Sequence, residues 1–511
     1  MEIVPFGQRA VLVRLGNQVN PGLLARVLHL DRWARKMRGV VETVPAYASL
    51  LVVFDPEVVA PGELSAHLRQ VPSHSEAVPQ GRVHEVPVVY GGEFGLDLPE
   101  VARWAGLSEQ EVVELHAGTE YLVYMLGFSP GFAYMGTVPE RIAAPRLPQP
   151  RLVVPAGSVA LAGRQTGIYP SSTAGGWRIL GRTPLRVFDP LQDPPARFEV
   201  GDRVRFVPVP RAQWPASPPA RQEPQGSAVL AVLDGGLLCT VQDLGRYGYR
   251  RYGVPPSGAM DPEALQAANF AVGNAGECAA LEFAWPAPVL EALVDVEVAL
   301  AGADFAPEVD GSPVPMGKPL RLRRGQVLRF RRPQQGRWCY LALAGGVAAP
   351  EVHGSRSTHA PSGLGGGVLR KGDVVRRARA LRGIAQPVRK PSIREGSVRV
   401  LPGPHLEAFP PGAVEQLLAG PYTVSVRSDR SGYRLDGPPI PHAGAGEILS
   451  EGMVVGALQV PPSGQPIVLM RDGPTAGGYP VLAVVVEEDL PGLAQKRPGE
   501  AVRFRLAGET G

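Results

Sequence analysis

Side chains that could bind an anion or an amide group gather in a Gly- and Pro-rich stretch from Glu120 to Pro190. Arginine, backbone N–H groups, amides and hydroxyls are the groups that bind carboxylates and stabilise charge on a carbonyl oxygen. Glycine and proline recur between short apolar runs, which is typical of strands joined by turns. We therefore predict that the turns of a β-barrel carry substrate-binding residues, namely Arg146, Arg151, Gln165, Tyr169 and Trp177.

A second group of charged residues lies in short turns of the C-terminal half. Gln242, Asp243 and Arg246 place an amide, a carboxylate and a guanidinium in one turn. Glu282 lies in the apolar string LEFAW, where an acid without a partner would be costly. We therefore expect Glu282 to be functional or to pair with Arg246 or Arg356. Further charges lie in tight turns at Asp429, Arg430, Arg434, Glu451 and Asp472.

The sequence contains no standard nucleotide or metal motif. The string from Gly311 to Pro319 resembles a phosphate-binding loop, but it has one residue too many between its glycines and a proline where Ser or Thr belongs. HExxH, GxSxG and GxGxxG do not occur, and no two histidines are spaced as a zinc pair, since His353 and His359 lie apart in a loop-like run. We predict neither a metal site nor a catalytic triad.

Length and composition indicate a cytoplasmic protein of several domains. A chain of 511 residues is too long for one hydrophobic core and should hold three or four domains. A net charge of +4 is small for this length, so neither a nucleic acid nor a membrane is an expected partner. The three cysteines form no CxxC pair, and the sequence has no export signal or long apolar span, which favours a cytoplasmic location.

The order of predicted elements divides the chain into five parts. Residues 1–82 show the strand and helix pattern of a small ferredoxin-like α+β domain, with its last strand expected at 83–89. Ser108 and Glu111 predict a capping box, and Asp261 with Pro262 predicts the start of another helix. The remaining predicted parts are a β-barrel at 83–207, a Pro-rich linker at 208–227, and two β-barrel parts at 228–390 and 391–511. The expected fold class is mainly β with α+β parts.

Longer strings in both halves resemble two partner families. GFSPGFAYMG, PRLPQPRLVVPAGSVALAG and GIYPSSTAGGWRILGRTP resemble allophanate hydrolase subunit 1, also called sporulation-kinase inhibitor or the B component of 5-oxoprolinase. TVQDLGRYGYRRYGVPPSGAMD, SDRSGYRLDG, SEGMVVGALQVPPSGQP and DGPTAGGYPVLAVVVEEDLPGLAQKRPG resemble allophanate hydrolase subunit 2, or the C component of 5-oxoprolinase. Together the strings cover nearly the whole chain in family order, so the two components look fused.

The resemblance implies cyclophilin-like β-barrels and an enzymatic role. The implied reaction is the ATP-dependent opening of 5-oxo-L-proline to L-glutamate. ATP and Mg would be bound with or by a separate partner protein, the A component of 5-oxoprolinase, which belongs to the LamB/YcsF-like family. Asp429 and Asp472 together could hold that magnesium ion. Two alternatives stay open: a regulator of a histidine kinase, or a component of a urea- or allophanate-related carboxylase or hydrolase. A homo-oligomer is not excluded.

For a lactam-opening reaction, the charged residues receive predicted roles. We predict Asp243, Glu282 and Asp429 as catalytic carboxylates. Gln242, Arg246, Arg430 and Arg434 join the first-half residues as predicted substrate-binding groups, and no residue is predicted as a metal ligand. The densest polar turns of the two halves lie at 145–182, 242–261 and 428–479, so we expect the working site where the halves meet.

Overall fold

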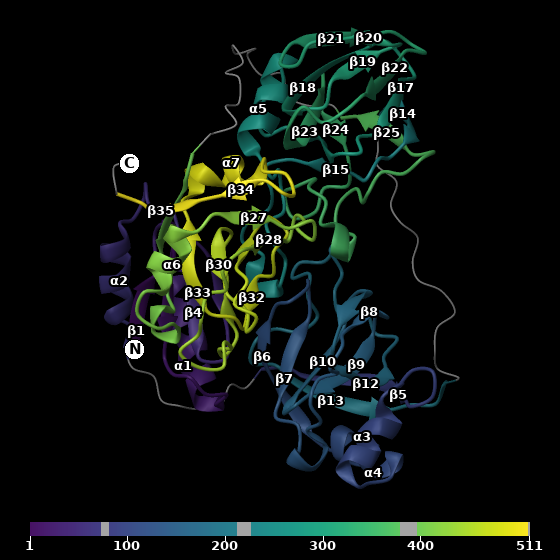
Figure 1. Cartoon of the computed structure of the whole chain (residues 1–511). Coiled ribbons are helices and arrows are strands. Elements are labelled where there is room, and N and C mark those ends of the chain that lie inside the picture. Colours follow the sequence, from purple (N-terminus) through teal and green to yellow (C-terminus); the bar gives the residue numbers. More distant parts are fainter. Residues whose placement is uncertain (73–80, 212–225, 379–395, 509–511) are drawn as a thin grey trace.

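The computed structural model describes residues 1–72, 81–211, 226–378 and 396–508, and these four ranges form four parts (Figure 1). We call them the N-terminal domain, the first barrel, the middle barrel and the last barrel, in chain order. Most of the predicted linker at 208–227 lies outside the described residues. Within the described ranges, no helix combines the length and the apolar character needed to cross a membrane.

The N-terminal domain is a four-stranded antiparallel sheet with two helices, as the α+β pattern predicts. Its sheet order is β1-β2-β4-β3. Side chains alternate along β4, so Leu50 and Val52 face the helices whereas Leu51 and Val53 face the last barrel. The elements are β1 (Glu2–Pro5), β2 (Ala10–Arg14), α1 (Pro21–Ala34), β3 (Val40–Pro45), β4 (Ser49–Phe54) and α2 (Pro61–Arg69).

The strand predicted to complete this domain belongs to the next one, so that prediction was wrong. β5 (Val83–Tyr90) pairs in parallel with β13 (Arg203–Pro208) and antiparallel with β12 (Arg178–Arg182) in the first barrel. The edge that a last strand would occupy in a ferredoxin-like sheet is already taken by β1 beside β2. A strand pattern predicts a strand but not its neighbours, because pairing partners can lie far away in sequence.

The first barrel is closed, with strand order β10-β7-β6-β13-β5-β12-β9. The predicted capping box is confirmed: the Ser108 hydroxyl accepts from the Glu111 backbone N–H, and the Glu111 carboxylate accepts from the Ser108 N–H at the start of α4. The other elements of the first barrel are α3 (Leu98–Ala105), α4 (Glu109–Ala117), β6 (Glu120–Leu126), β7 (Ala133–Gly136), β8 (Arg151–Val154), β9 (Ser158–Ala162), β10 (Gln165–Ile168) and β11 (Thr173–Gly175).

Replacing Ser108 with alanine should loosen the first turn of α4. Loss of an N-cap acceptor costs about 1 kcal/mol, which corresponds to roughly fivefold faster exchange from local opening. Hydrogen–deuterium exchange of peptides covering 109–117 measures this effect. Ser108→Asn keeps a cap acceptor and should exchange almost as slowly as the parent chain; equal exchange of the alanine and parent proteins would contradict the role of the cap.

The middle barrel consists of a seven-stranded and a five-stranded sheet packed around one core. The helix predicted at Asp261 is confirmed, because the Asp261 carboxylate accepts from the Ala264 N–H at the start of α5. The elements are β14 (Ser227–Asp234), β15 (Leu238–Gln242), α5 (Pro262–Ala271), β16 (Ala280–Ala284), β17 (Val289–Ala292), β18 (Val296–Asp304), β19 (Pro307–Val309), β20 (Ser312–Pro313), β21 (Pro319–Leu322), β22 (Val327–Phe330), β23 (Gln335–Leu343), β24 (Val347–Ala348) and β25 (Val374–Arg377).

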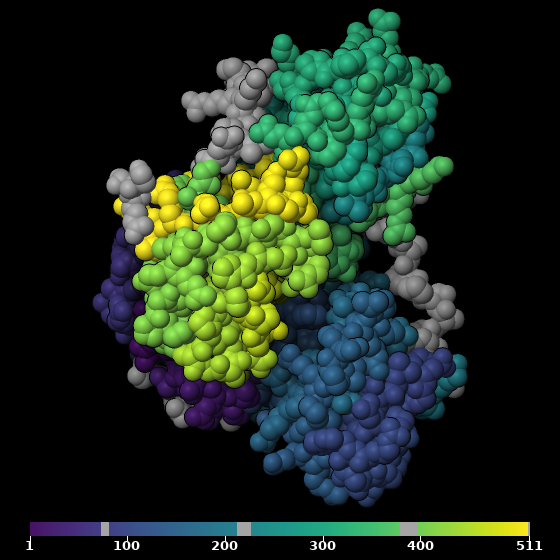
Figure 2. All heavy atoms as spheres, in the orientation of Figure 1, coloured from purple at the N-terminus to yellow at the C-terminus, as the bar shows by residue number. Residues whose placement is uncertain are grey.

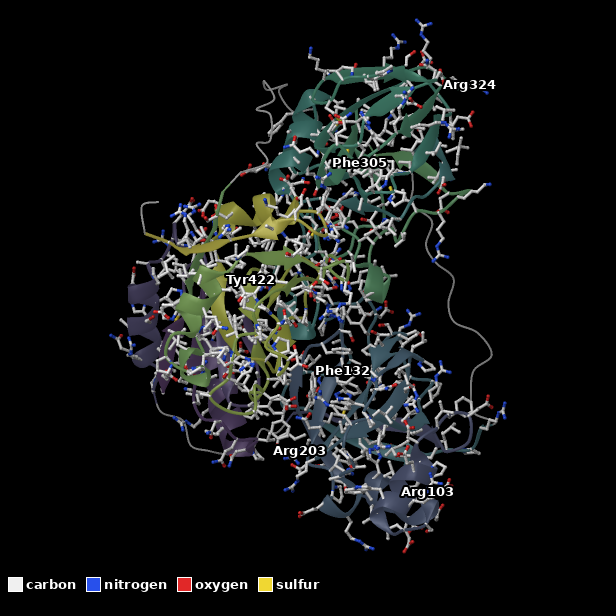
Figure 3. All side chains as sticks on the ribbon, in the orientation of Figure 1. Arg103, Phe132, Arg203, Phe305, Arg324 and Tyr422 are labelled. Atoms are coloured by element: carbon white, nitrogen blue, oxygen red, sulfur yellow. The ribbon has the colours of Figure 1, made fainter. Side chains whose placement is uncertain are left out.

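The last barrel is built on one eight-stranded sheet and contacts both the N-terminal domain and the middle barrel (Figure 2). Figure 3 places Phe132, Phe305 and Tyr422 inside the three barrels, and all three are buried. The elements of the last barrel are β26 (Val398–Pro402), α6 (Ala413–Ala419), β27 (Tyr422–Val424), β28 (Gly432–Asp436), β29 (Glu451–Gly452), β30 (Ala457–Gln459), β31 (Ile467–Leu469), β32 (Ala476–Gly477), β33 (Val481–Val485), α7 (Leu490–Ala494), β34 (Ala501–Val502) and β35 (Phe504–Leu506).

Alternation along two central strands explains why the middle and last barrels share a core. On β16, Leu281 and Phe283 face the core of the middle barrel, whereas Ala280 and Ala284 face the last barrel. The neighbouring strand β23 follows the same rule, with Tyr340 on the side of the last barrel. Glu282 shares the face of Ala280 and Ala284, so period-two geometry directs its carboxylate to the boundary between the barrels.

Candidate functional site

Buried charged and polar side chains converge where the middle and last barrels meet. They come from the end of β15 and the loop after it, from β16, from the loop that precedes residue 360, from the turn before β28, and from the turn after β31. We call this group the inter-barrel cluster, and it consists of Gln242, Arg246, Glu282, His359, Arg430 and Asp472, all buried. Five of the six were given a possible site role from the sequence, Asp472 as a magnesium ligand beside Asp429 and the other four as Gln242, Arg246, Glu282 and Arg430.

Arg430 lies at the centre of the inter-barrel cluster. Its guanidinium forms a two-bond contact with Asp472, at 2.8 and 3.1 Å, and also donates to Glu282 and to the Gly258 carbonyl oxygen. Burial alone would lower the pKa of Arg430, but Asp472 and Glu282 outweigh it and the net shift is upward. Burial raises the pKa of Asp472, but the charge of Arg430 lowers it by more, so the pKa lies below its ordinary value. The cluster therefore holds a charged arginine between two carboxylates.

Glu282 is paired, as its apolar sequence context required, but neither predicted partner forms the pair. The partner of Glu282 is Arg430, and Arg356 pairs with Glu351 at 2.9 Å. The second carboxylate oxygen of Glu282 accepts from the Tyr340 hydroxyl at 2.6 Å and from the Met260 N–H at 2.8 Å. With these donors, Glu282 joins the two barrels.

Asp261 adds a pH-dependent contact next to the inter-barrel cluster. Its carboxylate accepts from the Gln495 side chain at 2.8 Å, and burial raises its pKa from 3.8 to about 6. The folded state therefore binds this proton more tightly than the unfolded state, so Asp261 makes stability fall as pH rises from about 4 to about 6.

Replacing Asp261 with asparagine should remove this part of the pH dependence. The parent chain should lose about 2–3 kcal/mol more than the variant between pH 4 and pH 7, since one pKa unit corresponds to about 1.4 kcal/mol. Urea unfolding at several pH values measures the difference for the transition of the two joined barrels. Asp429→Asn, at an exposed position, is the control. Parallel pH profiles for the parent and Asp261→Asn would contradict the assignment.

Asp243 holds two loops together. Its carboxylate accepts from the Gly245 N–H at 2.8 Å, the Ser355 hydroxyl at 2.6 Å, the Ser357 hydroxyl at 2.5 Å and the Arg356 N–H at 2.6 Å. These contacts hold the loop after β15 against the loop at 355–357. The catalytic role of Asp243 stays a prediction. The neighbouring Gln242 side chain donates to the Thr358 carbonyl oxygen at 3.0 Å and so fixes the same loop.

Arg246 is buried, 2% exposed, and one of its N–H groups is unused. Its Nε donates to the Val352 carbonyl oxygen at 3.4 Å and its Nη2 to the Ser357 carbonyl oxygen. Its Nη1 is buried without a hydrogen-bond partner among the residues that the structure describes. Burial lowers the pKa of Arg246, while Asp243 and Asp472 oppose that shift. A buried donor of this kind suits an anion or a developing oxyanion.

His359 is the residue of the inter-barrel cluster that sequence reasoning missed. Its Nδ1 lies 2.6 Å from the Ser362 hydroxyl, and burial lowers its pKa from 6.5 to about 4. The imidazole is therefore neutral at pH 7, and a pKa this low makes it a hydrogen-bonding group and a weak base. The sequence analysis considered His359 only as a zinc ligand beside His353. The available signal was the short polar run SRSTHAPSG, which places several hydroxyls around this histidine.

Three predicted residues, Gln165, Tyr169 and Trp177, meet two further tyrosines at the mouth of the first barrel. We call this group the mouth cluster, and it consists of Tyr47, Tyr134, Gln165, Tyr169 and Trp177. Tyr47 comes from the N-terminal domain and accepts from the Gln165 amide at 2.5 Å. Arg146 is exposed beside the cluster, where its charge opposes the upward effect of burial on the pKa of the three tyrosines.

The remaining predicted residues lie outside both clusters. Arg151 forms a two-bond ion pair with Asp97, at 2.6 and 2.8 Å. Arg434 is exposed on β28. Asp429 is exposed and accepts from the Ser431 and Gly432 N–H groups, so the predicted magnesium site of Asp429 with Asp472 does not form. Among the described residues, no group of three or more His, Cys, Asp or Glu side chains could hold a metal ion.

The mouth of the first barrel contacts the loop that follows Arg246. The Gly131 N–H donates to the Tyr252 carbonyl oxygen at 2.8 Å, and an added Cβ on Gly253 would lie 2.6 Å from the Ser129 carbonyl oxygen. Phe128 and Ser257, at either side of this contact, have positive φ angles of 65° and 52°. Non-glycine residues rarely adopt this conformation, and it is often found at functional sites. Residues 129–131, which precede the predicted turns at 145–182, therefore contact the 242–261 turn of the other half, and a site shared by the predicted turns stays a prediction.

Comparison with protein families matches both halves of the chain. Residues 1–198 match the carboxyltransferase domain, subdomain C and D, and residues 252–506 match the carboxyltransferase domain, subdomain A and B. The crystal structure of TTHA0988 superposes on 97% of this chain and 99% of its own, with 39% identity and a TM-score of 0.83. The mainly β fold is therefore shared over nearly the full length.

Curated relatives correspond to one half each. The chain is 45% identical to the B component of 5-oxoprolinase from Escherichia coli O157:H7 over 40% of its length and 94% of the relative. It is 38% identical to the C component of 5-oxoprolinase from Escherichia coli K12 over 54% of its length and 90% of the relative. Urea amidolyase of Lachancea kluyveri is 32% identical over 53% of the chain but only 16% of that protein. The chain thus belongs to the family of the 5-oxoprolinase B and C components, with both components fused in one polypeptide.

Proposed function

We propose that this chain supplies the B and C components of an ATP-dependent 5-oxoprolinase, which opens 5-oxo-L-proline to L-glutamate together with a separate protein, the A component. The observation that carries the proposal is the near-complete presence of both relatives in one chain, 94% of the B component and 90% of the C component. The contact of residues 129–131 with Tyr252 and Gly253, which joins the two halves, supports it. The proposal implies a cytoplasmic location, where ATP is available.

The chemistry that such a site must supply is the hydrolysis of a cyclic amide. Water adds to the lactam carbonyl, the C–N bond breaks, and the ring nitrogen takes up a proton. Negative charge on the carbonyl oxygen needs a donor, and the unused N–H of Arg246 could supply one. The neutral His359 could orient the attacking water by a hydrogen bond. Glu282 and Asp472 then position Arg430 and the surrounding turns.

Magnesium and ATP fit this chain poorly on its own. Of the two aspartates proposed as magnesium ligands, Asp429 is exposed and accepts from backbone N–H groups, whereas Asp472 is buried and already committed to Arg430. No carboxylate set for a divalent cation forms among the described residues. We propose that the A component, of the LamB/YcsF-like family, holds ATP with Mg, which would activate the lactam for hydrolysis.

Mixing the purified chain with a homologue of the A component, ATP with Mg and 5-oxo-L-proline should produce L-glutamate and ADP. Each protein alone should give only background, because the proposal divides the reaction between them. Coupled assays for glutamate and for ADP measure the reaction. If several homologues of the A component bind the chain and still yield no glutamate above background, the proposal fails.

A second candidate function is carboxyl transfer in a urea-related reaction. The carboxyltransferase description of both family matches and the similarity to urea amidolyase favour it. It predicts consumption of a carboxylated biotin carrier when urea is added, with no requirement for the A component. Carrier decarboxylation that depends on urea, together with no glutamate formation in the previous assay, would favour this function over the first.

A further inference from the structure

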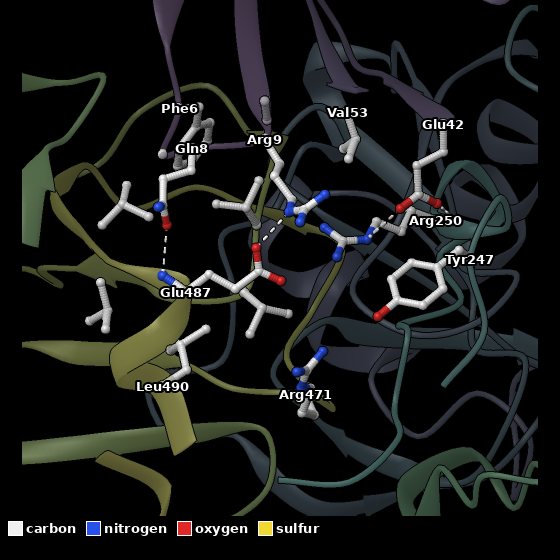
Figure 4. Close-up of a pocket in the computed structure, with 16 residues that line it drawn as sticks. Phe6, Gln8, Arg9, Glu42, Val53, Tyr247, Arg250, Arg471, Glu487 and Leu490 are labelled. Atoms are coloured by element: carbon white, nitrogen blue, oxygen red, sulfur yellow. Dashed lines mark hydrogen bonds and ion pairs between the residues drawn. The ribbon is translucent and has the colours of Figure 1, made fainter. Parts of the chain in front are cut away.

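A small pocket lies between the N-terminal domain and the last barrel (Figure 4). Its cavity volume is about 120 Å³, and apolar side chains from both parts line it, including Phe6, Val53, Val455, Val484 and Leu490. None of the residues predicted from the sequence as site residues lines it. The pocket therefore is a separate feature from the mouth cluster and the inter-barrel cluster.

Three arginines and a tyrosine hydroxyl give the pocket its polar character. Arg9 pairs with Glu487 at 2.6 Å, and Arg250 pairs with Glu42 at 2.9 Å and donates to the Met453 carbonyl oxygen. In Figure 4 the guanidinium groups of Arg9, Arg250 and Arg471 point toward the same space, with the Tyr247 hydroxyl at its edge.

Arg471 is the group in this pocket that lacks a counter-charge. Its side chain is half-buried, and its guanidinium forms no hydrogen bond or ion pair with any residue of the described ranges. The two carboxylates in the pocket, on Glu42 and Glu487, are already paired with the other two arginines. The pocket thus has one excess positive charge beside apolar walls, and a planar guanidinium favours a carboxylate through two parallel hydrogen bonds.

The volume limits the size of the ligand. Pockets for drug-sized molecules measure about 300–1,000 Å³, so a cavity of about 120 Å³ fits a molecule of amino-acid size and is too small for a nucleotide. The apolar walls favour a compact, weakly polar body. They offer no unpaired carboxylate to a second, cationic group of the ligand.

The pocket is directly connected to the inter-barrel cluster. Arg471 lines the pocket, and the next residue, Asp472, belongs to the cluster. The Arg471 carbonyl oxygen accepts from the Ser257 N–H at 3.0 Å, and Tyr247 and Arg250 of the pocket follow Arg246 in the same loop. A ligand on Arg471 would thus contact both chain segments that position the cluster.

We propose that this pocket binds a small monocarboxylate with a compact apolar body, and that Arg471 binds its carboxylate. The further identification of 5-oxo-L-proline as that ligand rests on the proposed function. Its single carboxylate and small ring match the excess charge and the size of the cavity. L-Glutamate should bind less well, because its ammonium group and second carboxylate would be placed against apolar walls.

Calorimetric titration and ligand-observed NMR on the full chain, without ATP or the A component, test the proposal. 5-Oxo-L-proline should bind saturably, whereas 2-pyrrolidone, the same ring without the carboxylate, should bind at least about tenfold more weakly. Arg471→Met should weaken 5-oxo-L-proline binding by about tenfold or more, and Arg471→Lys by less. Val455→Phe keeps every charge but fills the cavity, so it should also abolish binding. Arg427→Met, an exposed arginine of the last barrel, is the matched control and should bind as the parent does.

Each outcome supports the site or overturns it. Saturable binding that Arg471→Met and Val455→Phe leave unchanged would place the ligand elsewhere and overturn the proposal, as would no saturable binding of any small monocarboxylate. Binding of L-lactate through Arg471, without binding of 5-oxo-L-proline, would support the pocket and count against the proposed substrate. Binding of 5-oxo-L-proline without glutamate formation in the reconstituted assay would support the pocket and count against the proposed reaction.

Discussion

Replacing Arg430 with methionine should destabilise the joined middle and last barrels by about 3–5 kcal/mol. Arg430 is 4% exposed and is shared by Glu282 and Asp472, which are themselves buried. Methionine has a similar length but no charge, so it would leave two carboxylates uncompensated in an apolar boundary. The loss should be larger above the ordinary pKa of aspartate, because Asp472, whose pKa Arg430 lowers, carries its charge there.

Urea unfolding followed by tryptophan fluorescence measures this effect. Arg434→Met, an exposed arginine on the following strand, is the matched control and should change stability by less than about 0.5 kcal/mol. Adding Glu282→Gln and Asp472→Asn to the Arg430 variant should restore part of the loss, since the uncompensated charges are removed. An Arg430→Met chain as stable as the Arg434→Met chain would rule out the central role of this ion pair.

Replacing Arg246 with alanine should lower kcat of the reconstituted enzyme about 10²–10³-fold, which is the usual cost of removing one donor to a developing oxyanion. The reason is the buried Nη1 group, which has no partner among the described residues and lies in the cluster with neutral His359. Arg246 also holds the 352–357 loop through two backbone carbonyls, so a structural contribution must be separated from a chemical one.

Chemical rescue separates the two contributions. Millimolar guanidinium should restore part of the activity of Arg246→Ala if the missing group is the free donor, and methylammonium should restore less. Arg427→Ala, at an exposed arginine that pairs with Asp436 and with no residue of the cluster, should keep parental activity with or without guanidinium. Activity of Arg246→Ala within about threefold of the parent, at unchanged binding of the A component, would exclude Arg246 from the reaction.

Local sequence patterns predicted the elements of the fold well, because they depend on neighbouring residues. The cap residues Ser108 and Asp261 begin helices where their types and spacing indicated. The apolar string LEFAW indicated that Glu282 needs a partner, and in the structure Glu282 is buried on β16. The sheet to which residues 83–89 belong could not be predicted, because β5 pairs with β13, which lies more than a hundred residues later in the chain.

The sequence by itself determined which residue types the site contains and that Glu282 needed a partner. Only the tertiary structure decided that the partner is Arg430, 148 residues away, and that Arg151 is committed to Asp97 while Arg246 keeps a free donor. It also decided that Arg471 faces a pocket without a counter-charge. The physical reason is that the cost of burying a charge is set by local composition, whereas the group that compensates it is set by which strands and turns the fold brings together.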